Sequence, residues 1–137
     1  MNDNLNILSL SGGKDSTALL FMCLEQGIRI DAVFFIDTGK EFPAMYDHIA
    51  LVRSMLPKEI PFMSAKLDYD YWMYQHVKTK GKHIDSKGYG WPTSRVRWCT
   101  ALKREALSAL VYQLKIGGGR TFTIPEKEKH SGVTLTV

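Results

Sequence analysis

A glycine-rich segment near the amino terminus carries the residue types that point most directly to chemistry: Ser11-Gly12-Gly13-Lys14-Asp15-Ser16-Thr17. Two adjacent glycines let the backbone turn tightly and approach a ligand closely. A helix that begins just after them would direct its first backbone N–H groups and its dipole toward an anion. The hydroxyls of Ser11, Ser16 and Thr17 add donors, and Lys14 adds a positive charge. The segment therefore predicts a phosphate-binding loop, with an ordinary glycine turn as the alternative.

Asp15 brings a negative charge into this loop. Beside a phosphate its carboxylate suits a Mg²⁺ ion that bridges the phosphate oxygens, so we expect Asp15 to help hold Mg²⁺. The loop differs from the common P-loop, which needs a glycine five residues before a Gly-Lys-[Ser/Thr] triplet. Here Leu8 stands at that glycine position, and Asp15 rather than a hydroxyl residue follows Lys14. Lys14 and Asp15 are the expected catalytic residues.

A second polar segment, Asp37-Thr38-Gly39 with Glu41, follows the apolar run 31–37. We expect it to lie beside the first loop at the same sheet edge. There the two carboxylates would hold a ribose hydroxyl or a metal-bound water. As an alternative, Asp37 or Thr38 caps a helix that starts near Phe42-Pro43, and both roles are compatible.

A third set of residues is basic and consists of Arg95, Arg97, Lys103 and Arg104. Guanidinium groups suit bidentate binding of phosphate or sulfate. The spacings from Arg97 to Arg104 and from Arg95 to Lys103 put each pair on one helical face, provided that the helix reaches Arg95. The set predicts a site for the anionic end of a substrate, and the alternative is a solvated basic helix face.

The charge of the chain is unevenly distributed, although its total is only +4. Residues 1–77 carry six basic and ten acidic side chains, whereas residues 78–104 carry eight basic side chains and one acidic one. This asymmetry indicates an acidic partner or a nucleic acid at residues 78–104, where Tyr89, Trp91 and Trp98 are interleaved with the basic residues.

The elements that position these segments follow from the apolar pattern. Strands are expected over residues 5–10, 31–37 and 61–67, and helices over 15–26, 45–56 and 97–114. A short aromatic helix is expected over 69–77 and a long surface loop over 78–94; residues 121–124 and 133–137 form a hairpin or are loosely ordered. This alternation predicts an α/β fold, a parallel sheet with helices on both faces.

Composition excludes several classes of protein. The 137 residues are 45% hydrophobic and 23% charged, as expected for one globular domain rather than a disordered chain. Two cysteines, Cys23 and Cys99, cannot form a four-thiolate site, so no iron–sulfur cluster is expected. No apolar run approaches the roughly 20 residues of a membrane span, and the amino terminus does not resemble a signal peptide, so a cytoplasmic protein is expected. The four histidines show no metal-binding spacing.

Three motifs together resemble a known family. Ser11–Ser16 is similar to the PP-loop of the N-type ATP pyrophosphatases, whose fold is that of the adenine nucleotide α-hydrolases. Asp37-Thr38-Gly39 with Glu41-Phe42-Pro43, and Pro92 with Arg97-Trp98-Cys99-Thr100 and Leu102-Lys103, resemble motifs of the phosphoadenosine-phosphosulfate reductase family. The resemblance implies an adenine-nucleotide domain over residues 1–114, followed by a divergent or incomplete segment over 115–137.

The chain also departs from that family. The reductases carry a nucleophilic cysteine in a carboxy-terminal tail, which is absent here, so sulfonucleotide reduction is not expected. Residues 115–137 do not show the further strand–helix unit of longer members. We therefore expect a protein that binds ATP or phosphoadenosine phosphosulfate and transfers adenylate as an ATP pyrophosphatase does. The alternatives are a nucleotide-binding module without turnover and a nucleic-acid binder that uses residues 78–104.

Overall fold

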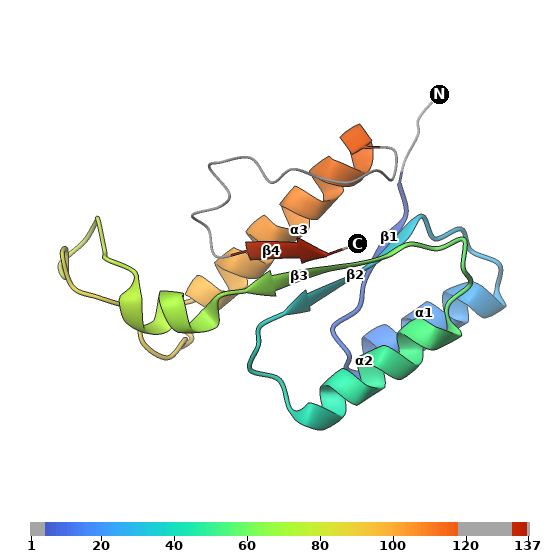
Figure 1. Ribbon diagram of the computed structural model, residues 1–137, viewed down its shortest axis with the longest axis horizontal. Coiled ribbons are helices and arrows are strands. Elements are labelled where there is room, and N and C mark those ends of the chain that lie inside the picture. The colour runs from blue at the N-terminus through green and yellow to red at the C-terminus, as the bar shows by residue number, and fades with distance from the viewer. Residues whose placement is uncertain (1–4, 118–132, 137) are drawn as a thin grey trace.

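The protein contains one mixed β-sheet, seen in a computed structural model that describes residues 5–117 and 133–136 (Figure 1). Strands β1 (Ile7–Ser9), β2 (Ala32–Asp37) and β3 (Phe62–Leu67) are parallel, in the order β1-β2-β3. Ser9 pairs with Phe34, and Asp37 pairs with Lys66. This register brings the carboxyl ends of the parallel strands, and the loops that follow them, to one edge of the sheet.

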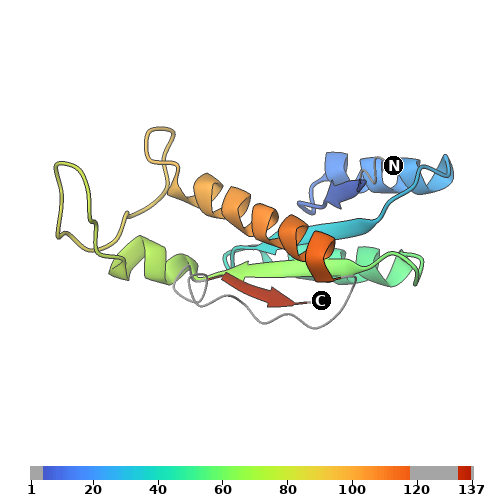
Figure 2. The ribbon, with the colours of Figure 1, turned by 90° about the horizontal axis from the view of Figure 1, so that it is seen from above.

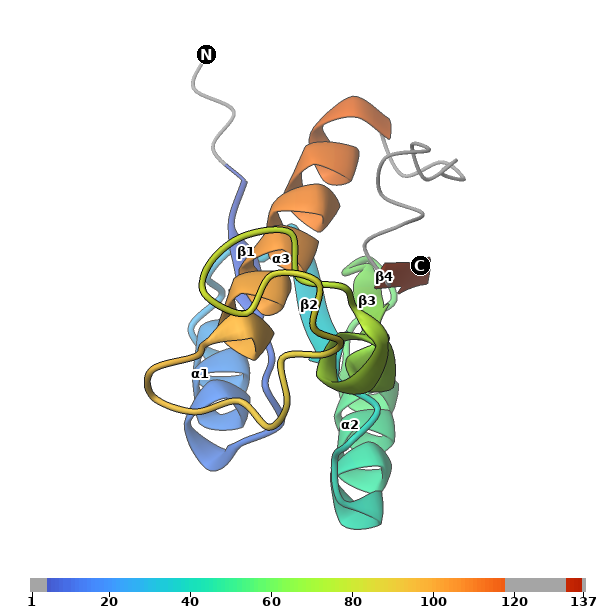
Figure 3. The same cartoon turned by 90° about the vertical axis from the view of Figure 1, so that its left-hand side faces the viewer.

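Helices cover both faces of the sheet, which confirms the predicted α/β fold. Figure 3 shows α1 (Lys14–Glu25) and α2 (Pro43–Met55) below the sheet and α3 (Trp98–Gly117) above it. Val33 and Phe35 of β2 pack toward Leu20 of α1 and toward Ile49 and Val52 of α2. The other face is buried by a second set of apolar side chains, which includes Phe34, Met63, Ala65, Trp98, Leu102, Ala106 and Leu110. Strand β2 is thus buried on both sides, as its unbroken apolar run predicts.

The short helix predicted over 69–77 is confirmed over residues 69–75, and it ends in the π-helical turn η1 (Tyr71–Gln75), in which the His76 N–H reaches back to the Tyr71 carbonyl. One expectation about the basic residues needs correction. Helix α3 begins at Trp98, so Arg95 and Arg97 lie in the loop before it. The two pairs of basic residues therefore do not share helical faces.

The carboxy-terminal strand β4 (Val133–Thr136) pairs antiparallel with β3, with Leu67 opposite Val133. This strand adds a fourth member to the sheet beyond β3. The expected hairpin partner, residues 121–124, lies outside the described residues, so the hairpin stays a prediction. The division of the chain at residue 114 also stays a prediction.

The side of β1 that faces away from β2 has no strand partner within residues 5–117 and 133–136. A groove of about 540 Å³ runs along it, with lining residues that include Leu5, Ile7, Leu19, Cys23 and Ile28. Leu19 and Ile28 are about half exposed. This edge of the sheet is therefore both unpaired and apolar. In the described part of the chain, no helix is long and apolar enough to cross a membrane.

Candidate functional site

The first loop, residues 11–17, leads from the carboxyl end of β1 into the first turn of α1. It lies at the end of the sheet where the parallel strands finish, called here the carboxyl edge. Gly12 has φ +85° and is buried against α2, where a Cβ atom would collide with the Met45 sulfur and lie 3.2 Å from Ile49 Cδ1. The positive φ disfavours any side chain at this position, and a Cβ would also push the Met45 side chain aside. The loop therefore follows a path that α2 fixes.

Hydroxyl groups hold the loop from within. The Ser16 hydroxyl accepts the Ser11 N–H at 3.2 Å and lies 3.0 Å from the Ser11 hydroxyl. The Thr17 hydroxyl donates to the Gly13 carbonyl at 2.8 Å and lies 3.0 Å from His48 Nε2. The Thr17 hydroxyl therefore links His48 of α2 to the Gly13 carbonyl of the loop. His48 is thus a positioning residue of the loop, a role that its sequence position did not indicate.

The groups that face outward from the loop are free to meet an anion. Gly13 is the N-cap of α1, and no side chain caps the amides of the first turn. Lys14 and Asp15 are exposed, and the two ion pairs found among the described residues join other side chains, Arg29 with Asp31 and Lys40 with Asp70. Uncapped helix amides beside a free ammonium group form an anion-binding arrangement.

The acidic side chains near the first loop show whether this region suits a Mg²⁺ ion. Within the described residues no group of three or more His, Cys, Asp or Glu side chains is placed to hold a metal. Mg²⁺ ordinarily needs only one or two carboxylates when phosphates and water supply its other ligands. The exposed Asp15 carboxylate fits that pattern, so these residues suit a phosphate-bound Mg²⁺ and not a metal held by protein alone.

The second segment, residues 37–41, is ordered by its own side chains. Asp37 Oδ1 accepts the Gly39 N–H at 2.7 Å and the Tyr46 hydroxyl at 2.8 Å. The buried Thr38 hydroxyl donates to Glu41 Oε1 at 3.2 Å. Helix α2 has Phe42 as its N-cap and no side-chain cap, so the capping alternative for Asp37 and Thr38 is wrong.

Tyr46 of α2 is a second contact that the sequence did not reveal. Burial raises the pKa of Tyr46, and the hydrogen bond to the Asp37 carboxylate raises it further. The hydroxyl therefore remains a proton donor to Asp37 through the neutral pH range. Together with His48 two residues later, Tyr46 makes α2 the element that supports both the first loop and segment 37–41.

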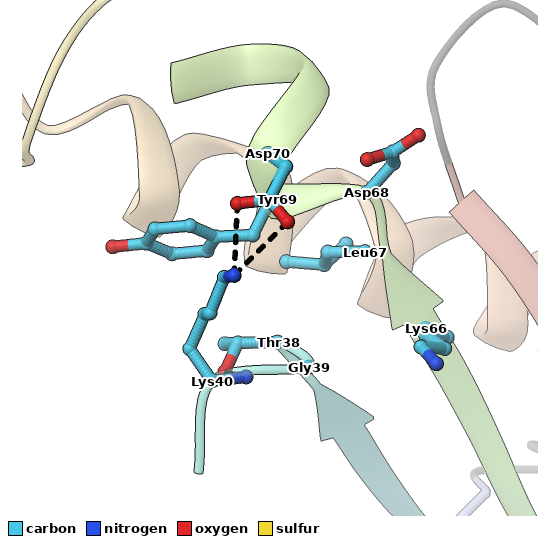
Figure 4. A pocket seen from close by; sticks show the side chains of 8 residues that line it. All are labelled: Thr38, Gly39, Lys40, Lys66, Leu67, Asp68, Tyr69 and Asp70. Carbon is cyan, nitrogen blue, oxygen red and sulfur yellow. Dashed lines mark hydrogen bonds and ion pairs between the residues drawn. The ribbon is translucent and has the colours of Figure 1, made fainter. Parts of the chain in front are cut away.

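A cavity of about 310 Å³ lies between the ends of β2 and β3. Thr38, Gly39 and Lys40 line one side, and residues 66–70 line the other (Figure 4). An ion pair between Lys40 Nζ and Asp70 Oδ1, 2.8 Å long, joins the two sides. No residue of the first loop lines this cavity, which therefore lies on the side of segment 37–41 away from β1.

The four predicted anion-binding residues lie on two elements near this edge. Arg95 and Arg97 are in the loop before α3, where Arg97 Nε donates to the Ser94 carbonyl at 3.0 Å. Lys103 and Arg104 are exposed in the second turn of α3. The Trp98 ring lies 4.7 Å from that of Tyr69, just after β3, and so places the start of α3 at the carboxyl edge.

Comparison with known proteins agrees with this fold and these motifs. The sequence matches the phosphoadenosine phosphosulfate reductase domain over residues 6–134. The chain therefore belongs to the phosphoadenosine phosphosulfate reductase family. This membership supports a role in nucleotide binding.

One curated relative is an uncharacterized 37.8 kDa protein in the gpa 5′ region of Escherichia phage 186. It is 30% identical over 112 residues, which cover 82% of this chain and 30% of that protein. The chain thus spans less than a third of the length of this relative. No solved structure matches the chain.

Proposed function

We propose that this protein binds an adenine nucleotide, ATP or phosphoadenosine phosphosulfate, with the phosphates at the first loop. The observation that carries the proposal is the uncapped amino terminus of α1 beside the exposed Lys14. Amide groups that have no intrahelical partner and no side-chain cap favour an anionic ligand, and the helix dipole adds to this preference.

The reaction that fits such a loop is adenylyl transfer. An acceptor oxygen would form a bond to the α-phosphorus, the bond from that phosphorus to the bridging oxygen would break, and pyrophosphate would leave. Lys14 would neutralise charge on the phosphates. The hydroxyls of Ser11, Ser16 and Thr17, which here hold the loop to itself, would exchange these bonds for bonds to the phosphate oxygens. Asp15 would hold Mg²⁺, which when bound supplies further neutralisation of the phosphate charge.

The remaining predicted residues would act around the nucleotide. Glu41, which Thr38 orients, would offer its carboxylate to a ribose hydroxyl. In Asp37 the Oδ1 atom already accepts hydrogen bonds from the Gly39 N–H and the Tyr46 hydroxyl. The exposed basic side chains near the start of α3 would bind the phosphate or sulfate end of the substrate; these are Arg95, Arg97, Lys103 and Arg104. A cytoplasmic location remains part of the proposal.

A nucleotide-binding module without turnover is the second candidate. The observation that favours it is the position of the cavity between β2 and β3, which none of residues 11–17 line. Binding and turnover therefore need separate measurements.

The test is a thermal-shift titration with Mg²⁺–ATP and with phosphoadenosine phosphosulfate, followed by an assay for pyrophosphate release. We expect the melting temperature to rise, because a ligand at about 100 times its Kd stabilises the folded state by about 2.7 kcal/mol. Lys14→Ala removes a charge-assisted contact and should weaken binding about tenfold, which corresponds to about 1.4 kcal/mol.

Lys58→Ala is the matched control, because Lys58 is also exposed but lies just before β3, at the opposite edge of the sheet. Pyrophosphate release that Asp15→Ala abolishes would support adenylyl transfer, whereas binding without release would support the module. If neither nucleotide raises the melting temperature at millimolar concentration, the proposal is wrong.

A further inference from the structure

Between η1 and α3 the chain doubles back into a projection that extends beyond the carboxyl ends of β2 and β3 (Figures 1 and 2). We name residues 76–90 the basic finger. The Gly88 N–H donates to the His76 carbonyl at 2.6 Å, and the Lys78 N–H donates to the Ser86 carbonyl at 3.0 Å. An antiparallel bridge joins Val77 to Lys87. Main-chain hydrogen bonds thus give the predicted surface loop a hairpin-like shape.

A row of aromatic rings fixes the root of the finger. The Trp72 and Tyr89 rings stack at 6.2 Å and 14°, and the His76 ring packs against both, at 4.4 Å from Trp72 and 5.1 Å from Tyr89. The Tyr89 ring in turn stacks on Trp98 at 6.4 Å and 22°. Gly88 has φ +69°, and a Cβ atom there would collide with the Met73 carbonyl oxygen. The finger therefore leaves the domain in a defined direction.

The charge of the finger is not neutralised within the described part of the protein. Its basic side chains are four lysines, Lys78, Lys80, Lys82 and Lys87. Asp85 is its single acidic residue, and neither ion pair of the described residues involves the finger. Lysines along a projecting backbone suit a polymer of negative charges better than one small anion.

Two exposed aromatic side chains flank the root. Residues 72–73 and 89–90 run side by side, because the Trp72 carbonyl accepts the Tyr89 N–H at 2.9 Å and the Met73 carbonyl accepts the Gly90 N–H at 3.0 Å. The next residue on each segment is Tyr74, 63% exposed, or Trp91, 70% exposed. An acidic protein surface would need only the lysines. Exposed rings beside them provide stacking platforms for unpaired bases.

We propose that the basic finger, together with Trp91 and Tyr74, binds single-stranded nucleic acid. The lysines would contact successive phosphates, and the two rings would stack on bases. Of the other two rings that the sequence pattern suggested, Trp98 is buried and Tyr89 is half-buried in the aromatic row at the root. The Trp91 ring meets Tyr69 at 6.3 Å but stays 70% exposed. This proposal does not depend on nucleotide binding at the first loop, and it makes a nucleic acid the macromolecular partner of the protein.

The test measures the fluorescence anisotropy of a labelled oligothymidylate of about 20 nucleotides. The full chain is titrated at several salt concentrations from about 50 to 300 mM, because single-strand binding weakens with salt by about 0.7 logarithmic units per phosphate contact. The double variant Lys80→Glu/Lys82→Glu should reduce this salt slope by about 1.4. Trp91→Ala should weaken binding about tenfold and leave the slope unchanged.

Lys58→Glu is the charge-matched control for the single variant Lys80→Glu, and it should change the affinity for the oligonucleotide far less. Lys14→Ala should bind the oligonucleotide with unchanged affinity even if it no longer binds ATP. Circular dichroism checks that each variant is folded. Equal effects of Lys58→Glu and Lys80→Glu, or an unchanged affinity in Trp91→Ala, would overturn the proposal. Polyglutamate that binds as tightly as the oligonucleotide would also overturn it, by assigning the finger to an acidic protein.

Discussion

The first loop and the basic finger both lie at the carboxyl edge of the sheet, yet different forces hold them. The first loop rests on α2, which belongs to a buried core, and its hydroxyls are tied within the loop. The finger projects beyond the sheet and depends on main-chain bonds and a row of rings. The loop can thus place a few donors accurately around a small ligand, whereas the finger can spread charge over a long one.

The largest expected effect tests the support of the first loop by α2. Gly12→Ala adds a Cβ where φ is +85° and forces the Met45 side chain to repack, so we expect the free energy of unfolding to fall by about 2–3 kcal/mol. Gly27→Ala is the control, because Gly27 has φ +67° but no atom near its Cβ position, and it should cost about 1 kcal/mol. Urea unfolding measures both. Equal losses would mean that α2 does not fix the loop.

A smaller effect is expected at the root of the finger. Gly88→Ala forces a Cβ against the Met73 carbonyl and should lower the free energy of unfolding by about 2 kcal/mol. Because Gly88 belongs to neither of the two hydrophobic cores, we expect the substitution chiefly to displace the finger. Limited proteolysis should then cleave residues 76–90 faster while nucleotide binding persists. Gly90→Ala, with φ +69° and open space around it, is the control. If Gly88→Ala also loses nucleotide binding, the first loop and the finger are not independent of each other.

The smallest effect concerns pH. Folding raises the pKa of Tyr46, mainly by burial and then through Asp37. The stability linked to this group is therefore fully present below its ordinary pKa of 10.0 and is lost as pH rises through the raised value. Tyr46→Phe should lose about 1 kcal/mol at neutral pH and show a shallower decline above pH 10 than the parent. Urea midpoints across that range measure the difference; parallel declines would contradict it.

The sequence predicted the fold where local pattern decides structure. The apolar runs at 31–37 and 61–67 located β2 and β3, and the Gly12-Gly13 turn marked the start of α1 within one residue. The expected start of α3 at residue 97 is likewise within one residue of the observed start at Trp98, but the spacing of the basic residues could not show that the helix stops short of Arg95. The antiparallel pairing of β4 with β3 is a long-range contact without a local signal.

For the site, the sequence identified the loop residues but not what supports them. Thr17 and His48 are 31 residues apart, and Asp37 and Tyr46 meet only because α2 packs beneath the sheet. The sequence pattern suggested two roles for Asp37, nucleotide contact and helix capping. The structure shows that Asp37 Oδ1 orders a turn and binds Tyr46 and that α2 has no side-chain cap, so the capping role is wrong, while the nucleotide contact stays a prediction.

The edge of β1, which has no strand partner among residues 5–117 and 133–136, is expected to matter at high concentration. A strand whose N–H and C=O groups are left open beside an apolar groove, which Leu19 and Ile28 help to line, is a template onto which another extended chain can add. Self-association through this edge would extend the sheet from one molecule into the next and would not involve the nucleotide loop or the finger. A lysine at the exposed Ser9 would place a charge on that edge and should keep concentrated samples monodisperse.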